Sequence, residues 1–378
     1  MATREPEQRV TPLELFFDLV FVFAFTQVTA LMSDHPTWEG VGQGMLVLAA
    51  VWWAWGAYSW LTNEIDPDED RARVAVFAAM ASMLVAALAV PGAFTDDGVL
   101  FGVAYFVVRA LHIVVFAYAT PNVSVVLAVR RLARTAIPAP ALLILAGALD
   151  GAAQALIWCL ALAIDYGGPS VFGVSGYQVS PGHFAERYGL VLIIALGESI
   201  VAIGVGAAGI PLDAAVVAAA LAGIVIAGSL WWAYFDVAAV LAERRLRAAA
   251  GDARARLARD SYSYLHLPMI AGIVLLALGV KKTLGDVDAA LEAVPAVALC
   301  GGVALYLLAH IAFKLRVTGS VTPPRAAAAA ACVAFIPLAL EVDALAAVAS
   351  IAAICALLVA FETIRYRESR ARVRAAGA

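Results

Sequence analysis

Apolar stretches about as long as a membrane is thick recur along nearly the whole chain, and this feature limits the fold more than any other. A helix needs about 20 consecutive, mostly apolar residues to cross the hydrocarbon core of a bilayer, which is roughly 30 Å thick. Only 14% of the 378 residues are charged, against roughly 25% in soluble domains, and the mean hydropathy is +0.90. The sequence therefore predicts an all-α fold, a polytopic transmembrane helical bundle, and excludes a water-soluble globular domain.

About twelve helices are predicted between the Gly, Pro and polar residues that interrupt the apolar stretches. They cover residues 13–33, 41–62, 74–92, 99–119, 133–148, 151–165, 185–207, 213–236, 264–281, 291–314, 325–341 and 344–364. The fifth and sixth are short and separated only by "GALDG", so they could be tilted, re-entrant or a single segment. The start "MATREPEQRV" leads directly into the first apolar stretch, and no cleaved signal peptide is expected.

Basic residues collect on one side of this twelve-helix topology. Counting alternate connections from the N-terminus places 22 Lys and Arg residues on one side and two, Lys281 and Lys282, on the other. Basic loops stay in the cytoplasm, so both termini are predicted to be cytoplasmic. The Arg-rich stretch 242–259 is predicted to form a solvated cytoplasmic helical hairpin, attracted to anionic lipid, and the tail after Ile364 is interpreted in the same way.

The two halves of the chain resemble each other. The segment "VTPLELFFDLVFVFAFTQV" aligns with "VSPGHFAERYGLVLIIALGESI", which pairs Glu14 with Glu186 and, further on, Gln27 with Glu198. Each half then has a tryptophan pair, in "VWWAWGAY" (51–58) and "LWWAYFDV" (230–237). Matches in the same order indicate a duplication.

A His-Ile dipeptide in the fourth helix of each half, at His112 and His310, continues the same order. The repeated unit has six helices, and because six is even, both copies enter the membrane in the same sense, as two parallel repeats. The predicted division is a first repeat at 1–168, a Gly-, Pro- and Ser-rich connecting loop at 169–184, and a second repeat at 185–378.

A carboxylate stands inside the first apolar stretch. A charged side chain at the centre of a bilayer costs roughly 2.5–3.5 kcal/mol, so Asp18 needs a compensating environment. Asp18 lies about one turn from Glu14 and shares a helical stripe with Phe25 and Thr29, which is predicted to face the bundle interior. Gln27 points nearly the opposite way and is predicted to bond to a neighbouring helix.

The corresponding helix of the second half carries Arg187 and Glu198 on nearly the same stripe. They are about 16 Å apart at 1.5 Å per residue, too far to pair. Glu186 and Arg187 are predicted to lie at the cytoplasmic end, where exposure costs less. Gly197 is predicted to allow a close approach of another helix beside Glu198.

Basic side chains inside the membrane could balance these acids. Arg109 and His112 share one helix face, as do His310 and Lys314, and a pair of Asp18 or Glu198 with Arg109 would neutralise both groups. Such groups either fix the helix register as structural ion pairs or line a path for an ion, a proton or a small solute. The candidates for that path are Glu14, Asp18, Gln27, Arg109, His112, Glu186, Arg187, Glu198 and His310.

No catalytic residue, metal or cofactor is predicted. The cysteines lie in apolar stretches without CxxC or Cys/His spacing, and they are interpreted as packing residues: Cys159, Cys300, Cys332 and Cys355. No HExxH and no persuasive Ser/His/Asp arrangement is present. The arginines lack interleaved aromatic residues, so nucleic acid is not an expected partner. The expected partners are membrane lipids and the ion or solute, and a homo-oligomer is left open.

Two segments together, "LELFFDLVFVFAFTQV" and "HFAERYGLVLIIALGESIVAIG", resemble the signature segments of the bacterial low temperature requirement protein A (LtrA) family. The similarity runs over essentially the whole chain. It implies a multi-pass protein of the bacterial plasma (inner) membrane that is associated with growth at low temperature, and it implies no substrate. The signature residues are Glu14, Phe17, Asp18, Glu186, Arg187, Gly197 and Glu198.

The leading functional hypothesis is a transporter or ion pathway with its site on the first and seventh helices. Neither helix has an internal proline of the kind that breaks helices at many transporter sites. The alternatives are an intramembrane lipid-modifying enzyme and a membrane scaffold or sensor.

Overall fold

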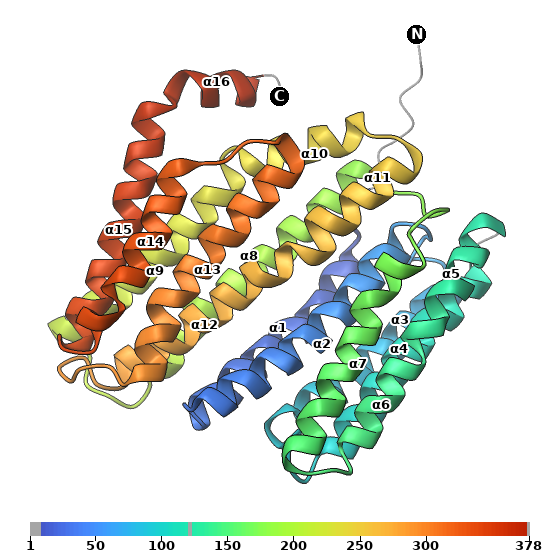
Figure 1. Ribbon diagram of the computed structural model, residues 1–378, viewed down its shortest axis with the longest axis horizontal. Coiled ribbons are helices and arrows are strands. Elements are labelled where there is room, and N and C mark those ends of the chain that lie inside the picture. Colours follow the sequence, from blue (N-terminus) through green and yellow to red (C-terminus); the bar gives the residue numbers. More distant parts are fainter. Residues whose placement is uncertain (1–8, 120–122, 376–378) are drawn as a thin grey trace. The chain divides into compact units, whose positions relative to one another are not determined.

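The computed structural model describes residues 9–119 and 123–375, and in this part of the chain the fold is all-α (Figure 1). Extended pairing among the described residues is limited to an isolated antiparallel bridge between Ala290 and Asp343. The outer ends of the two predicted repeats, 1–8 and 376–378, lie outside the described residues. The chain divides into two compact units, and each is assembled from separate stretches of sequence.

Unit 1 comprises Met1–Leu31, Glu39–Arg187 and Leu246–Arg259. It holds most of α1 and α2, all helices from α3 to α7, the first turns of α8, and α11. The bounds of these helices are α1 (Pro12–Asp34), α2 (Trp38–Thr62), α3 (Asp70–Leu88), the short η1 (Val90–Gly92), α4 (Gly98–Ala119), α5 (Val123–Ala136), α6 (Pro138–Ala146), α7 (Gly151–Val171), α8 (Pro181–Gly206) and α11 (Gly251–Ala258). Helix α4 packs on α3 and α6, and α6 packs on α7. The large buried side chains of α2, Trp52, Trp55 and Tyr58, fill the core.

Unit 2 comprises Met32–Trp38, Tyr188–Arg245 and Asp260–Ala378. Its helices follow the rest of α8: α9 (Ala214–Phe235), α10 (Ala238–Ala248), the π-helical η2 (Arg259–Tyr264), α12 (His266–Gly285), α13 (Ala293–Thr318), α14 (Pro323–Ala339), α15 (Ala344–Arg365) and α16 (Arg367–Ala375). Helix α12 packs along α13, and α9 packs on α15. Gly272 and Gly302 let the backbones of α12 and α13 approach closely, because a Cβ added at Gly302 would lie 2.6 Å from the Gly272 carbonyl oxygen.

Nine helices of the described chain are long and apolar enough to cross a membrane. They are α1, α2, α3, α4, α8, α9 continued by α10, α11 continued by α12, α13 and α15. Helix α14 is apolar but shorter. The expectation of a polytopic all-α membrane protein is confirmed, and each of the twelve predicted segments overlaps a helix.

The structure differs from the prediction around the connection of the two halves. The predicted helix 133–148 is broken into α5 and α6 at Pro138, which has no backbone N–H to continue the ladder. Helix α7 extends to Val171 with Pro169 inside its last turn, and α8 begins at Pro181. The irregular connection is therefore 172–180, shorter than the predicted loop 169–184.

The Arg-rich stretch 242–259 is helical as predicted, but it is not simply solvated. Leu246, Ala255 and Ala258 are buried, and Arg254 donates to the Val179 carbonyl oxygen at 3.1 Å. Residues 246–259 of this stretch thus pack within unit 1 on the connection that precedes α8. The tail forms α16, which buries no residue, although Arg370 of α16 pairs with Asp236.

Candidate functional site

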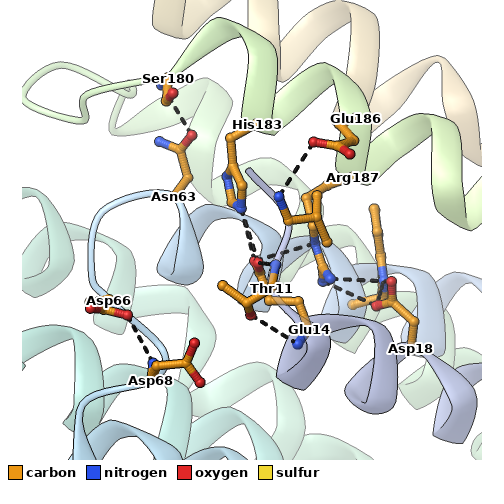
Figure 2. Close-up of polar contacts among 12 residues, drawn as sticks. Thr11, Glu14, Asp18, Asn63, Asp66, Asp68, Ser180, His183, Glu186 and Arg187 are labelled. Carbon is orange, nitrogen blue, oxygen red and sulfur yellow. Dashed lines mark hydrogen bonds and ion pairs between the residues drawn. The ribbon is translucent and has the colours of Figure 1, made fainter. Parts of the chain in front are cut away.

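A capping box fixes the first acid of α1. Thr11 precedes the helix, and its Oγ1 accepts a hydrogen bond from the Glu14 backbone N–H at 3.3 Å. The Glu14 carboxylate reaches back and accepts from the Thr11 N–H at 2.9 Å (Figure 2). Pro12 suits the first helical position, where no N–H is needed. The sequence "TPLE" therefore holds Glu14 in place at the start of the helix.

Two residues of α8 meet the acids of α1. His183 and Arg187 are four residues apart, so they lie on one face of the helix. His183 Nε2 lies 3.0 and 3.1 Å from the two Glu14 carboxylate oxygens. Arg187 Nη2 lies 3.0 Å from Asp18 Oδ1, Nη1 donates to Oδ2 at 3.2 Å, and Nε lies 3.7 Å from Glu14 Oε1 (Figure 2). The guanidinium thus bridges both carboxylates.

Trp55 of α2 completes this group. Its indole Nε1 donates to Asp18 Oδ1 at 2.9 Å, and the Arg187 guanidinium carbon lies 5.6 Å from the indole ring centroid, a cation–π distance. We call Glu14, Asp18, Trp55, His183 and Arg187 the charge cluster. All five belong to unit 1, and each is no more than 1% exposed.

The charge cluster can bury ions because they balance and bond one another. Ions removed from water are tolerated where opposite charges and hydrogen bonds replace the lost solvation. Both carboxylates receive at least two donors, and their one permanent cation is Arg187. In the described part of the chain no group of three or more His, Cys, Asp or Glu side chains is placed to hold a metal ion. The cluster thus holds its two carboxylates with its own guanidinium, imidazole and indole.

A second buried ion pair in unit 1 corrects the partner predicted for Arg109. Arg109 of α4 pairs with Asp165 of α7 at 2.8 Å, and not with Asp18 or Glu198. Asp18 already has its guanidinium in Arg187, and Asp165 lies in the second-last turn of an α7 that extends beyond the predicted segment 151–165. His112 is buried next to the rings of Tyr58 and Phe116.

In unit 2 His310 contacts an arginine that the sequence analysis did not single out. Arg325 Nη1 lies 2.7 and 3.0 Å from the two ring nitrogens of His310, while its Nε and Nη2 donate to Glu362 at 2.8 Å each. Lys314, which shares a helix face with His310, donates instead to Thr322 at 2.8 Å. Arginine is only a donor, so His310 offers a ring lone pair and is neutral.

Of the nine predicted site residues, the structure brings together Glu14, Asp18 and Arg187. Glu186 and Arg187, which were both predicted to lie at the cytoplasmic end, differ in exposure: Arg187 is buried, whereas Glu186 is exposed and accepts from the Val10 N–H at 3.3 Å. Successive helical residues point about 100° apart, so one faces out while the next enters the charge cluster. The remaining candidates, Gln27, Arg109, His112, Glu198 and His310, lie outside the cluster. Gly197 does not serve a close approach, because a Cβ there would meet no atom within 4 Å.

Sequence reasoning missed His183 and Trp55, although a signal for His183 was available. Aligning the two "V-T/S-P" starts without a gap, at an offset of 169 residues, places Glu14 opposite His183 and Asp18 opposite Arg187. Both contacts in the structure have this separation of 169 residues. The pairing of Glu14 with Glu186 in the predicted alignment is therefore not the register of contact. Asp165, Arg325 and Glu362 were also missed.

The connection before α8 is held by the residues that follow α2. Asn63 Nδ2 donates to the Gln178 carbonyl oxygen at 2.7 Å. Its Oδ1 accepts from the Ser180 N–H at 3.0 Å (Figure 2). The Glu64 carboxylate accepts from the Gln178 N–H. These bonds fix the chain immediately before the turn of α8 that carries His183.

Glu64 is expected to make stability depend on pH. Burial raises its pKa from 4.5 to about 7, and the Gln178 N–H partly offsets the rise. Between these two values the folded chain holds a proton that the unfolded chain releases. The stabilisation is thus full below about pH 4.5 and is lost as the pH rises through about 7. Thermal unfolding in detergent at about pH 5 and about pH 8 should show this fall, and it should shrink in Glu64→Gln. The prediction is contradicted if Glu64→Gln loses as much stability between the two pH values as the wild type does. It is also contradicted if the exposed control Glu69→Gln reduces the pH dependence as much as Glu64→Gln does.

Comparison with known proteins places the whole site in a shared region. The family model described as "Bacterial low temperature requirement A protein (LtrA)" matches residues 9–360. The chain is also similar to a protein of Rhizobium meliloti (strain 1021) described as "Uncharacterized protein RA0937". The two are 29% identical over 329 residues, which cover 82% of this chain and 78% of that protein. The family match includes every residue of the charge cluster.

Proposed function

Because the chain belongs to the bacterial low temperature requirement A (LtrA) family and has nine apolar, membrane-length helices in its described part, we propose that it is a transporter or ion pathway in the bacterial plasma membrane. It moves an ion or a small solute, lies among membrane lipids, and supports growth at low temperature. The observation that carries this proposal is the charge cluster. Ionisable groups buried within membrane helices commonly mark ion and solute paths.

The proposal includes two parallel repeats with cytoplasmic termini and twelve crossings. Two turns of contact support the parallel arrangement, since Glu14 meets His183 and Asp18 meets Arg187 one helical turn further on. The starts of α1 and α8 therefore run in the same sense. In each unit a tyrosine also bonds to the helix of the tryptophan pair, Tyr105 to Ala50 O at 3.0 Å and Tyr306 to Leu230 O at 2.9 Å.

The alternative functions make different use of the same residues. In a scaffold or sensor the charge cluster would only fix the helix register. In a lipid-modifying enzyme a carboxylate or the imidazole of the cluster would act as nucleophile or general base on a lipid that reaches it. Flux therefore separates the proposal from both alternatives.

Flux through proteoliposomes tests the proposal. The purified chain is reconstituted, and H⁺, Na⁺ and K⁺ movement is recorded under imposed gradients. Glu14→Gln and Asp18→Asn are expected to slow the wild-type flux about tenfold or more, a barrier change of about 1.4 kcal/mol, because each removes a cluster charge. Glu186→Gln, which removes an exposed carboxylate of α8, should retain the wild-type rate. The same variants should differ in restoring growth of a deletion strain in the cold.

Two outcomes would overturn the transport proposal. The first is a folded wild-type chain that moves none of these ions and none of a panel of small solutes. The second is full flux in both cluster variants. Either result would leave the scaffold and the enzyme as the remaining functions.

A further inference from the structure

His183 differs from a histidine that is merely packed in a core. Its Nε2 faces two carboxylate oxygens of Glu14, which only accept hydrogen bonds, so this nitrogen carries a hydrogen and donates it. Its other nitrogen, Nδ1, is buried and has no hydrogen-bond partner among the described residues. The ring is therefore satisfied on one side only.

His266 of unit 2 provides the contrast within the same chain. It is equally buried, but both of its nitrogens are bonded. Nδ1 lies 3.0 Å from the Ser261 carbonyl oxygen, which accepts only, so Nδ1 carries the hydrogen. Nε2 then accepts from the Tyr234 hydroxyl at 2.8 Å. With these two bonds both nitrogens of the neutral His266 ring have a partner, unlike those of His183.

The charge cluster has two protonation states, which differ by one proton on His183. With a neutral His183 ring, the carboxylates of Glu14 and Asp18 face the single cation of Arg187, and one negative charge is buried without compensation. With an added proton on Nδ1 the cluster is neutral, but the new N–H has no acceptor in the described structure. Each protonation state thus has one unfavourable feature, and the ion pairs and hydrogen bonds of the charge cluster do not select one of the two.

We infer that the charge cluster takes up and releases one proton at His183 Nδ1, and that a proton is the ion, or the coupling ion, of the pathway. The identification as a transported ion rests on the proposed function, whereas proton binding itself does not. On uptake a hydronium ion or a protonated solute gives up its proton, one N–H bond forms at Nδ1 as the bond to that donor breaks, and the ring becomes an imidazolium paired with Glu14. On release the proton leaves from the same nitrogen to a water molecule or a solute that reaches it.

The groups that face this site come from three helices. Helix α1 supplies the carboxylates of Glu14 and Asp18, and α8 supplies the guanidinium of Arg187. Helix α2 supplies the Trp55 indole, which donates to Asp18. Arginine keeps its proton at every accessible pH, so the exchangeable proton belongs to His183 and the two acids as a coupled set.

Histidine nitrogen resonances report this proton directly. The full-length chain with ¹⁵N-labelled histidine is reconstituted in liposomes and titrated from about pH 8 to about pH 5, where an ordinary histidine changes charge. Solid-state NMR separates the neutral tautomers from the imidazolium among the five histidines. We expect the signal lost in His183→Gln to change from neutral to imidazolium on acidification. The signal lost in His266→Gln is expected to stay neutral throughout.

Glu14→Gln provides a second test that does not require His183 to be replaced. It removes the carboxylate that stabilises the imidazolium, so the midpoint for His183 should fall by about one pH unit or more, a tenfold change in proton affinity. The exposed control Glu186→Gln should leave the midpoint unchanged. A His183 ring that is neutral at every pH, imidazolium at every pH, or indifferent to Glu14→Gln would overturn the proton site.

Proton flux measured with an entrapped pH indicator separates the two proposals. If His183 exchanges its proton and no ion moves across the membrane, the proton site stands and the transport function fails. If an ion moves at the wild-type rate in His183→Gln liposomes, the transport function stands and the proton is not its coupling ion.

Discussion

Replacing Arg187 with glutamine is expected to lower the free energy of unfolding by about 3–5 kcal/mol, because it leaves two buried carboxylates without their cation. Arg187 contacts both Glu14 and Asp18, so no other side chain of the charge cluster can supply the lost charge to both acids. Unfolding by SDS in mixed micelles, followed by tryptophan fluorescence, measures the change. Arg187→Lys keeps the charge and loses the fork of donors, so it should cost less.

A double variant distinguishes lost charge balance from lost packing. Adding Asp18→Asn to Arg187→Gln removes the unpaired carboxylate and should restore part of the stability, so the two changes are not additive. Additive losses would mean that Arg187 stabilises the chain through packing alone. Glu186→Gln is the matched control, since it alters the adjacent, exposed residue of the same helix.

Replacing Gly302 with alanine is expected to lower the free energy of unfolding by about 1–3 kcal/mol, the usual range for overpacking a core. The added Cβ would lie 2.6 Å from the Gly272 carbonyl oxygen and 2.7 Å from the Leu276 backbone nitrogen. Both atoms are backbone, so relief requires α12 and α13 to move apart. The same SDS unfolding assay measures the loss.

Gly228 of α9 provides the control for that substitution. A Cβ added there would meet no atom within 4 Å, and the residue is exposed. Gly228→Ala should therefore leave stability unchanged or raise it by about 0.5–1 kcal/mol through the helix preference of alanine. If Gly228→Ala and Gly302→Ala lower the free energy of unfolding equally, the loss in Gly302→Ala does not come from the close approach of α12 and α13.

Much of the fold could be predicted from hydropathy, because a membrane-spanning helix is a long and simple signal. The predicted helix 13–33 corresponds to α1 (Pro12–Asp34), and the predicted helix 344–364 corresponds to α15 (Ala344–Arg365). Prediction was weakest where the signal was mixed. Helix α5 is amphipathic and carries Arg130, Arg131 and Arg134, so its first half was assigned to a loop and its end was joined to the apolar α6.

The burial of Asp18 could be predicted, while its partners could not. A carboxylate within an apolar helix must face protein, and one sequence is enough to find such a residue. The partner of Asp18 depends on which helices pack together and on how they are shifted along their axes. The hydropathy of the sequence gives neither piece of information. Arg109 was therefore assigned to the wrong acid, and the structure pairs it with Asp165, at the end of the predicted segment 151–165.

The common separation of 169 residues has a consequence for how such a chain could arise by duplication. In a symmetric dimer of identical ancestral subunits, a residue on the twofold axis meets its own copy, so an acid would face an acid and an imidazole an imidazole. Fusion of the two genes removes that restriction. Once joined, one copy could keep Glu14 and Asp18 while the other acquired His183 and Arg187, which gives opposite charges where self-pairing would place like ones.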